Sequence, residues 1–150
     1  MKTIFITGAS RGIGFEMARQ SLSCGNRVIA SCRNPDDADE LNSLMDSYDQ
    51  LDLLEMDVCS NDSVNACLSH LYSKRQPIDL LFNNAGIIDW RNFHEITEDS
   101  FAKIYQTNVV GAFLCLRACL PCLRLSGSPL VVNLSSRLGS IDLRGETQLG

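Results

Sequence analysis

The stretch Thr7-Gly8-Ala9-Ser10-Arg11-Gly12-Ile13-Gly14 decides the predicted fold. It lies between a short apolar run, which predicts a strand, and an amphipathic run, which predicts a helix beginning near Gly12. In that context Gly8 permits a tight turn, Gly12 lets the backbone approach a pyrophosphate, and Gly14 lets the helix lie against the strand. The helix N-terminus then offers free N–H groups to an anion. The stretch predicts a dinucleotide-binding turn, and a glycine-rich turn without a ligand is the alternative.

Short apolar or β-branched runs alternate with longer helical patterns along the rest of the chain. The five expected strands are Thr3–Thr7, Arg27–Cys32, Leu51–Asp57, Ile78–Asn83 and Leu130–Leu134. The stretches between them are long enough for helical crossovers, which is the order that produces a parallel sheet with both faces covered. The predicted fold class is therefore α/β, a Rossmann-type three-layer sandwich with a parallel sheet, formed by residues 1–150 as a single domain.

Four helices are expected between these strands. The first carries Ile13, Met17, Ala18, Ser21 and Leu22 inward and ends at Cys24-Gly25-Asn26. The second begins at Asn34-Pro35-Asp36 and runs to about Ser47. The third is capped by Ser60 or Asn61 and buries Val64, Leu68 and Leu71. The longest helix runs from about Glu98 to Leu120. The residues expected to face the sheet are Phe101, Ile104, Val109, Phe113 and Leu116.

Composition narrows the class of protein. With 18 acidic and 13 basic residues, the chain lacks the basic face that binding a nucleic acid requires. No apolar run approaches the roughly 20 residues needed to span a bilayer, so we expect no membrane partner and a cytoplasmic protein. Seven cysteines, an odd number scattered among apolar neighbours, suit reduced, buried thiols better than a disulfide framework.

The end of the second strand indicates which dinucleotide would bind. Folds that prefer NAD place an acidic residue about 20 positions past the glycine motif, whereas an arginine nearby accommodates the 2′-phosphate of NADP. Here the strand ends in Ala30-Ser31-Cys32-Arg33 without an acid, and Arg11 in the turn reaches the same corner. A guanidinium matches the geometry and charge of a phosphate, so we expect NADP (NADPH). The alternatives are two ordinary surface arginines and binding of NAD.

Five motifs in sequence order resemble those of the short-chain dehydrogenases/reductases: Thr7–Gly14, Asp57-Val58, Asn83-Asn84-Ala85-Gly86, Asn108 and Val131–Ser136. The resemblance spans the whole chain. The stretches Cys32–Pro35 and Ser135–Ile141 are similar to the carbonyl-reductase-like, NADPH-using branch of that family. The resemblance implies hydride transfer between NADPH and a small-molecule carbonyl or secondary alcohol.

The resemblance also implies roles for individual residues. Asp57, beside Val58, would hydrogen-bond the adenine amino group. Asn108 would bend its helix, bind a water and join a proton relay. Ser136, rather than its neighbour Ser135, would hydrogen-bond the substrate oxygen. The expected cofactor contacts are Gly8, Ser10, Arg11, Gly12, Ile13, Gly14, Arg33, Asp57, Val58, Asn84, Ala85 and Gly86.

Simpler interpretations of three of these residues stay open. Asp57 would cap the next turn, a role compatible with binding adenine. Asn84 would belong to a plain asparagine-rich turn. Asn108 would face solvent from its helix, although asparagine is a mediocre helix former.

The family's catalytic Tyr-x-x-x-Lys pair is absent. None of Tyr48, Tyr72 and Tyr105 is followed by lysine four positions later. The chain ends at Gly150, within the loop expected to lead to the catalytic helix. We therefore expect the N-terminal portion of a family member, truncated after the fifth strand, inactive by itself and prone to association at that edge strand. The full-length form is expected to be a homo-oligomer, and the alternative function is a non-catalytic dinucleotide-binding or regulatory module.

Cys115, Cys119 and Cys122 lie on one face of the longest predicted helix. Cys119 and Cys122 have the spacing of zinc or redox sites. Their neighbours are apolar, and no partner histidine or second cysteine pair lies nearby in the sequence, so we expect packing and no metal site.

Overall fold

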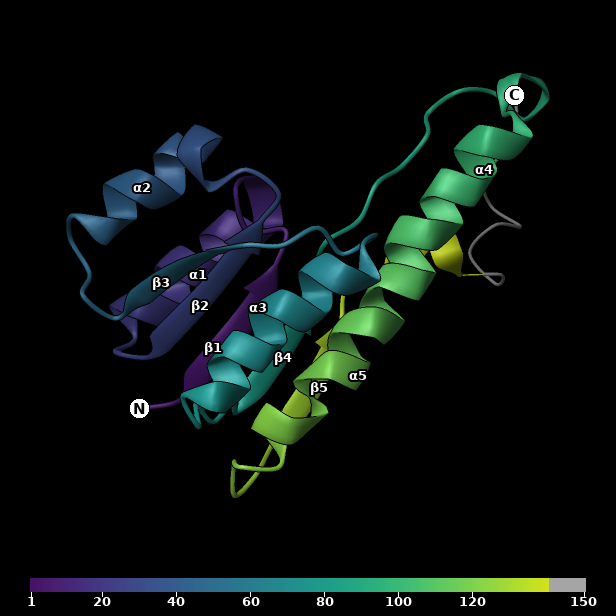
Figure 1. Ribbon diagram of the computed structural model, residues 1–150. Coiled ribbons are helices and arrows are strands. Elements are labelled where there is room, and N and C mark those ends of the chain that lie inside the picture. The colour runs from purple at the N-terminus through teal and green to yellow at the C-terminus, as the bar shows by residue number, and fades with distance from the viewer. Residues whose placement is uncertain (141–150) are drawn as a thin grey trace.

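A computed structural model describes residues 1–140 of the chain, except the side chain of Leu138. Five parallel strands form one sheet in the order β3-β2-β1-β4-β5 (Figure 1). The strands are β1 (Thr3–Thr7), β2 (Arg27–Cys32), β3 (Leu51–Glu55), β4 (Leu80–Asn83) and β5 (Leu130–Asn133). The predicted parallel α/β fold is confirmed.

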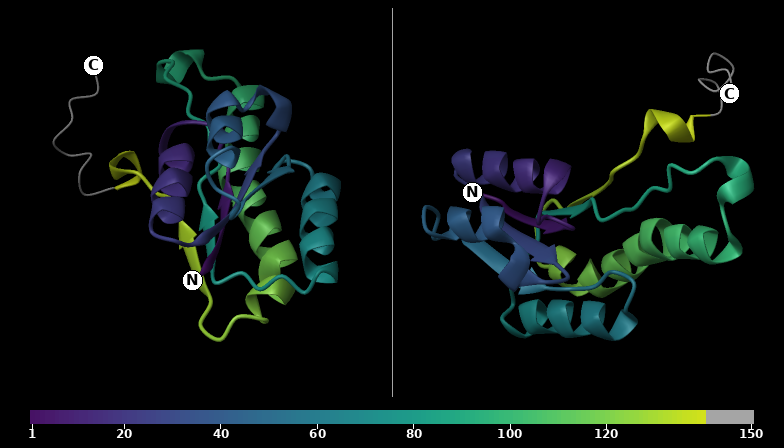
Figure 2. Two further views of the ribbon diagram at one scale, coloured as in Figure 1. Left: turned by 90° about the vertical axis from the view of Figure 1, so that its left-hand side faces the viewer. Right: turned by 90° about the horizontal axis from the view of Figure 1, so that it is seen from above.

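The strand order creates a crevice at the carboxyl edge of the sheet. The chain moves outward from β1 through β2 to β3 and then returns to place β4 on the other side of β1. Connections therefore leave the ends of β1 and β4 in opposite directions, the switch point at which open α/β sheets bind ligands. The segments that follow β4 and β5 both extend away from this edge (Figure 2).

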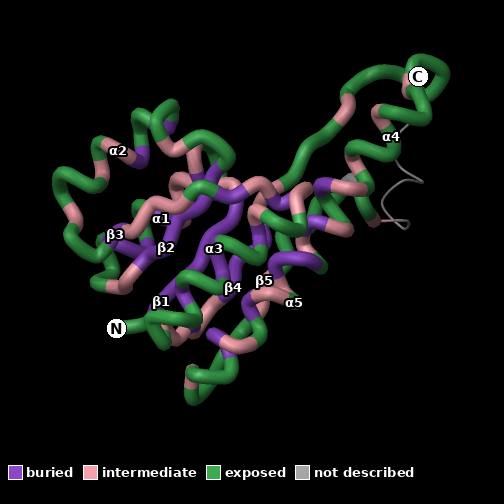
Figure 3. Tube along the Cα trace, viewed as in Figure 1, coloured by how far each residue is buried: buried purple, intermediate pink, exposed green. Residues whose placement is uncertain are grey.

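Helices cover both faces of the sheet. Helices α1 (Gly12–Ser23) and α2 (Asp39–Met45) pack on one face around Ile4, Ile6 and Val28. Helices α3 (Asn61–Ser73) and α5 (Ala112–Leu123) pack on the other face around Phe5 and Ile29 (Figure 2). Successive β1 side chains thus enter opposite layers, as the two-residue period of a strand requires. Buried residues follow the strands and the inner helix faces (Figure 3).

Three predicted strands are one or two residues too long. β3 ends at Glu55, β4 begins at Leu80, and β5 ends at Asn133. Met56, Asp79 and Leu134 still donate their N–H groups to the neighbouring strands. Asp57, however, turns toward α3, and the Ile78 N–H donates to the Cys122 carbonyl oxygen at the end of α5. Ile78 is nevertheless fully buried, so its apolar side chain indicates a position in the core and not a position in a strand.

The first three helices lie close to where the sequence predicts them. α1 begins at Gly12, ends before Gly25 at φ +76°, and buries Ala18, Ser21 and Leu22. The prediction is wrong for Ile13, which is 59% exposed because it faces the cleft described below rather than the core. The second helix is divided into a 3-10 turn, Pro35–Asp37, and the short α2. The third is capped by the Ser60 hydroxyl, as predicted.

The longest predicted helix is three segments in sequence. α4 (Glu98–Tyr105) leads into a π-helical turn (Gln106–Gly111) and then into α5, which ends at Leu123 rather than Leu120. The predicted inward face is wrong at Phe101, Val109 and Phe113, which are each at least half exposed, whereas Leu116 packs against the core as predicted. The π turn changes the helical phase, and the sequence is apolar on both sides, so a constant 3.6-residue period selects the wrong face. The buried residues are instead Thr107, Gly111, Leu114, Cys115, Cys119, Cys122 and Leu123.

The helical stretch Glu98–Leu123 is long and apolar enough to cross a membrane by length and composition alone. This corrects the expectation that no segment reaches such a length. The same test is passed by core helices of globular proteins, and α5 packs against α3 through buried cysteines and leucines. The absence of a membrane partner stays a prediction.

All seven cysteines are free. Five of them are buried, Cys24 is exposed and Cys59 is partly buried, so the prediction of buried thiols fails only at these two positions. Cys67, Cys115, Cys119 and Cys122 belong to the core between α3 and α5. Among residues 1–140, no group of three or more His, Cys, Asp or Glu is arranged to hold a metal ion.

Candidate dinucleotide-binding site

A cleft of about 1030 Å³ runs along the carboxyl edge of the sheet. It is lined by the residues that follow all five strands and by one side of the π turn. All but one of the residues predicted as cofactor contacts line it, together with Asn108, Ser135 and Ser136. The exception is Gly14, which is buried beneath the turn against Gly8, Ala9 and the Asn84 side chain.

Two glycines of the turn pack against the segment that follows β4. Gly8 has φ +65°, and a Cβ there would lie 2.8 Å from the Cα atom of Ala85. A Cβ on Gly14 would lie 2.5 Å from the side-chain nitrogen of Asn84 and 2.6 Å from the Gly8 carbonyl oxygen. Neither position has room for a side chain, so both glycines serve the close packing of the turn.

Gly12 differs from these two glycines. It has φ +61°, which favours glycine, but a Cβ there would meet nothing within 4 Å. The open space lies at the beginning of α1, where Arg11 is the N-cap and no side chain of the described residues caps the helix. Uncapped first-turn N–H groups with an open approach favour an anion.

Hydrogen bonds join the ends of β1 and β4. The Asn84 side chain donates to the carbonyl oxygens of Thr7 and Gly8, both at 2.9 Å. The Thr7 hydroxyl oxygen accepts from the backbone N–H groups of Asn84 at 3.1 Å and Ala85 at 3.0 Å. The Asn84 side chain therefore holds the ends of β1 and β4 together at the floor of the cleft. This is a more specific role than that of a residue in a plain asparagine-rich turn. The sequence analysis did not predict that Thr7 accepts these hydrogen bonds. The available signal was a threonine at the end of an otherwise apolar strand.

Asp57 and Val58 lie where β3 ends. One carboxylate oxygen of Asp57 accepts from the N–H of Cys59 at 2.9 Å, so the predicted turn-capping role is present. The other oxygen has no hydrogen bond with residues 1–140 and remains available to a donor in the cleft. Val58 is buried and packs on Gly111 of the π turn, where a Cβ would lie 3.0 Å from its Cγ2 atom.

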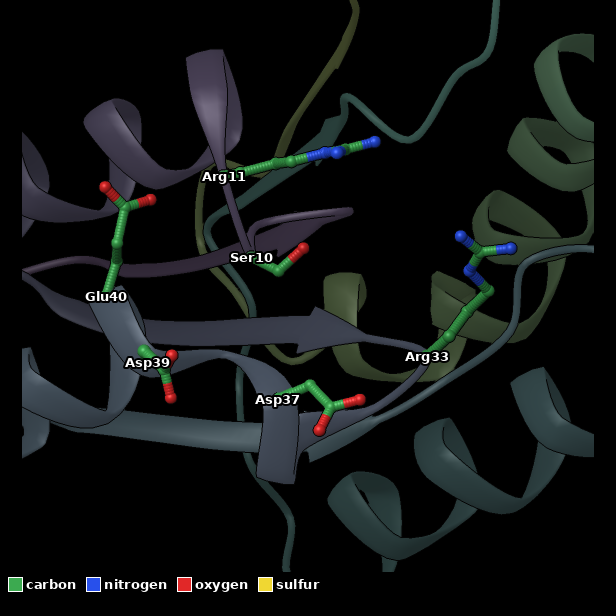
Figure 4. Close-up of a pocket in the computed structure, with 6 residues that line it drawn as sticks. All are labelled: Ser10, Arg11, Arg33, Asp37, Asp39 and Glu40. Carbon is green, nitrogen blue, oxygen red and sulfur yellow. The ribbon is translucent and has the colours of Figure 1, made fainter.

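Arg11 and Arg33 face a side pocket of about 420 Å³ that opens beside the main cleft (Figure 4). Ser10 and three acidic residues, Asp37, Asp39 and Glu40, complete its lining. Within residues 1–140, neither guanidinium forms an ion pair. Two unpaired guanidinium groups beside one pocket form a suitable receptor for a phosphate.

Asn108 is bonded on both sides of its amide to one residue. Its Nδ2 donates to the Ile87 carbonyl oxygen, and its Oδ1 accepts from the Ile87 N–H, both at 2.8 Å. The residue lies in the π turn, which is the distortion that the family resemblance implied. Asn108 therefore does more than face solvent: it ties the π turn to the segment after Gly86.

Asn83 and Asn133 end β4 and β5 as register partners. The Asn83 Nδ2 donates to the Asn133 Oδ1 at 2.8 Å, and the Asn83 Oδ1 is buried without a partner among the described residues. Ser135 and Ser136 follow β5 and line the same end of the cleft. A buried acceptor without a donor is costly, so this end of the cleft favours a ligand or water that supplies an N–H or O–H.

Several cleft residues were not predicted as site residues, among them Cys32, Met56, Cys59, Ile88, Thr107 and Asn133. Most lie at a strand end or within a few residues past one, and that position was the available signal. Burial raises the pKa of the Cys32 thiol, so this side chain is neutral beside the arginine pocket.

The chain is similar to known proteins along nearly its whole length. The family model described as short chain dehydrogenase matches residues 2–147. The NADPH-dependent pterin aldehyde reductase of Arabidopsis thaliana is 32% identical over 92% of this chain and 57% of its own length. An oxidoreductase of Botryotinia fuckeliana is 32% identical over 96% of this chain and 52% of its own length. The chain thus spans a little over half the length of these curated relatives.

Solved structures show the same likeness. The NADPH-bound carbonyl reductase from chicken fatty liver has a TM-score of 0.89 and 28% identity, over 95% of this chain and 62% of that one. The carbonyl reductase Sniffer of D. melanogaster has a TM-score of 0.87 and 29% identity, over 95% of this chain and 64% of that one.

Proposed function

Since the chain belongs to the short-chain dehydrogenase family, we propose that it binds NADPH in the cleft at the carboxyl edge of its sheet. The observation that carries the proposal is the side pocket, where Arg11 and Arg33 lie without anionic partners among the described residues. Relatives and neighbours whose names include NADPH support the same choice of cofactor.

The residues present fit the adenosine, 2′-phosphate and pyrophosphate parts of this cofactor. The uncapped start of α1 and the open space at Gly12 suit the pyrophosphate. The unbonded oxygen of Asp57 suits the adenine amino group, as in the family. The two arginines would hold the 2′-phosphate. Asn84, Ala85 and Gly86 would border the middle of the cofactor.

The proposed reaction is hydride transfer between the cofactor and the substrate carbon: NADPH would give a hydride to a carbonyl carbon while the oxygen takes up a proton, or NADP would accept a hydride from a secondary alcohol, which loses a proton. Ser136 would donate a hydrogen bond to the substrate oxygen. Asn108 would position the π turn and the segment containing Ile87, both of which line the cleft. The sequence of residues 1–150 contains no Tyr-x-x-x-Lys pair, so we propose that this chain binds the cofactor without turnover.

The second candidate is a non-catalytic dinucleotide-binding or regulatory module, which would use the same cleft and glycine turn. The two candidates are distinguished by the coding sequence beyond Gly150. An in-frame tyrosine followed four residues later by lysine supports the enzyme, whereas a stop codon supports the module. A cytoplasmic location, the absence of a nucleic-acid partner and a homo-oligomeric full-length form belong to the proposal as well.

The test of the cofactor is calorimetric titration with NADPH and NADH. Replacing a guanidinium bonded to phosphate removes a charge-assisted contact, so Arg33→Ala should weaken NADPH binding about tenfold and leave NADH unchanged. The matched control is Arg124→Ala, an exposed arginine at the far end of α5, which should change neither affinity. Equal affinity for both cofactors, unaltered by Arg33→Ala, contradicts the proposal.

A further inference from the structure

We infer that Asp37 is a specificity-determining residue that opposes the 2′-phosphate and holds NADPH affinity below what Arg11 and Arg33 alone would give. The inference rests on the proposed function, because it assigns a role to the wall of the pocket in which the 2′-phosphate would lie. Nothing in the family resemblance concerns this residue.

The first observation is the composition of the pocket. Its lining contains two guanidinium groups and three carboxylates, those of Asp37, Asp39 and Glu40. The carboxylates form no ion pair with the arginines. Side chains of both signs therefore share one small pocket without neutralising each other directly, and an entering phosphate meets repulsion as well as attraction.

The second observation is the direction of the side chains. Figure 4 shows the Asp37 carboxylate pointing to the same side of the pocket as the side chains of Arg11 and Arg33. In that view Asp39 and Glu40 lie on the opposite side, away from Arg33. Asp37 is therefore the acid placed to act on a group held between the arginines.

The third observation is that Asp37 is fixed. The side-chain amide of Asn34 donates a hydrogen bond to the Asp37 carboxylate. The 3-10 turn carrying Asp37 is in turn held by Asn42, whose Nδ2 donates to the Pro35 carbonyl oxygen at 3.0 Å. These hydrogen bonds favour the orientation in which the Asp37 carboxylate lines the pocket.

The size of the effect follows from screening. The walls of a pocket of this volume are about one Debye length apart, which is about 8 Å at physiological ionic strength, so the repulsion is reduced without being abolished. Interactions between exposed charges at such range change an equilibrium by a few-fold. We expect removal of the Asp37 charge to strengthen binding of a 2′-phosphate about threefold.

The experiment measures dissociation constants of 2′,5′-ADP and 5′-AMP, which differ only by the 2′-phosphate. Asp37→Asn removes the charge and keeps an oxygen that accepts from Asn34. Asp36→Asn is the matched control, because this exposed acid lies in the same 3-10 turn but does not line the pocket. We expect Asp37→Asn to tighten 2′,5′-ADP about threefold and to leave 5′-AMP unchanged, with a clearly smaller effect for Asp36→Asn.

Two results overturn the inference. In one, Asp36→Asn tightens 2′,5′-ADP as much as Asp37→Asn does, so that overall charge explains the change. In the other, Asp37→Asn leaves 2′,5′-ADP binding unchanged or weaker. An Arg33→Ala variant separates this failure from failure of the proposed function: if it loses the preference for 2′,5′-ADP, the arginine pocket stands and only Asp37 is refuted. If it keeps that preference, the proposed phosphate site itself is wrong.

Discussion

Gly8, Gly12 and Gly14 share one motif but meet different surroundings. Gly8 and Gly14 are enclosed by the chain itself, whereas Gly12 faces open space at the cleft. The sequence predicts the turn because all three glycines are needed there. It does not show which glycine is needed for folding and which for a ligand, because that depends on Asn84 and Ala85, which follow β4 and are distant in the sequence.

These surroundings predict different outcomes for alanine substitution. Gly12→Ala should cost about 1–2 kcal/mol, because a non-glycine residue there adopts a left-handed conformation without a clash. It should also abolish dinucleotide binding by filling the open space. Gly8→Ala should cost clearly more stability, because a Cβ 2.8 Å from the Ala85 Cα forces the backbone to move. Urea unfolding measures both variants, and an equal loss of stability would count against this account.

Ile13 illustrates the limit of sequence reasoning at this scale. It was expected both to face the core and to contact the cofactor, and the structure places it at the cleft with 59% exposure. An apolar residue in the first turn of a helix satisfies a core pattern and a ligand-facing pattern equally well. Periodicity cannot separate the two interpretations until the helix is placed on the sheet.

Among the elements, the π turn has the most specific consequence for the site. Asn108 within it holds Ile87 by two hydrogen bonds. We predict that Asn108→Ala frees this segment and raises the amide hydrogen-exchange rate of Ile87 about fivefold, equivalent to about 1 kcal/mol for exposed hydrogen bonds. Asn108→Asp keeps the acceptor of the Ile87 N–H and serves as the control. Unchanged exchange at Ile87 in the alanine variant would refute the tether.

Asp79 joins elements at the opposite edge of the sheet. Its carboxylate accepts from the Ser126 hydroxyl at 2.6 Å and from the Thr3 N–H at 2.7 Å, and these bonds lower its pKa. A lowered folded-state pKa gives stability that is present above the ordinary range of aspartate, about 3.9, and is lost as pH falls through the lowered value. We therefore expect Asp79→Asn to reduce the free energy of unfolding at pH 7.

The pH dependence supplies the check on Asp79. The difference between wild type and Asp79→Asn should shrink as the pH is lowered below about 4, because the native carboxylate then becomes protonated. Asp36→Asn, which removes the carboxylate of an exposed residue, is the reference. A difference that stays constant from pH 7 to pH 3 would show that the Asp79 charge contributes nothing.

The long helical stretch shows why some elements resist prediction. Its existence follows from the sequence, as does the distortion near Asn108 by family resemblance. Its inward face does not follow, because Phe101, Val109 and Phe113 are apolar yet exposed. α4 has no buried residue in the described structure, so nothing in its own packing fixes which side faces inward.

For the molecule as a whole, the parallel sheet and both helical layers could be predicted, because strand and helix patterns alternate regularly. The order of the strands in the sheet was not predicted. The lining of the cleft was predictable where a family motif marks it, as at Asp57. It was not predictable at Cys32 or Thr107, because the cleft gathers residues from every strand end. The acidic residues that line the arginine pocket, Asp37, Asp39 and Glu40, could likewise not be predicted, because only the tertiary structure brings them beside Arg11 and Arg33.

The buried thiols make the free energy of unfolding depend on pH. Burial raises the pKa of Cys67 to about 11 and that of Cys115 to about 12, because a thiolate is poorly solvated between α3 and α5. Raised folded-state values give stability that is complete below the ordinary thiol pKa, about 8.5, and lost as pH rises through the raised values.

This predicts alkaline loss of stability. The free energy of unfolding should fall between about pH 8.5 and pH 11, and fall less in a Cys67→Ala variant. Cys24→Ala, which removes the exposed thiol, is the control and should follow the wild type. Urea unfolding at pH 7.5 and pH 10 measures both. If Cys67→Ala loses as much stability as the wild type over this range, the raised pKa of Cys67 is not a source of the effect.

The central claim is that one dinucleotide spans the carboxyl edge of the sheet from the arginine pocket to the ends of β4 and β5. Its most direct test is the two-dimensional amide NMR spectrum of the chain recorded with increasing NADPH. The account predicts saturable shifts at Ser10 to Ile13, Arg33, Asp57, Val58 and Asn84 to Gly86, and none at the amino edge around Asp79. An unchanged spectrum at millimolar NADPH, or shifts confined to other parts of the chain, would contradict it.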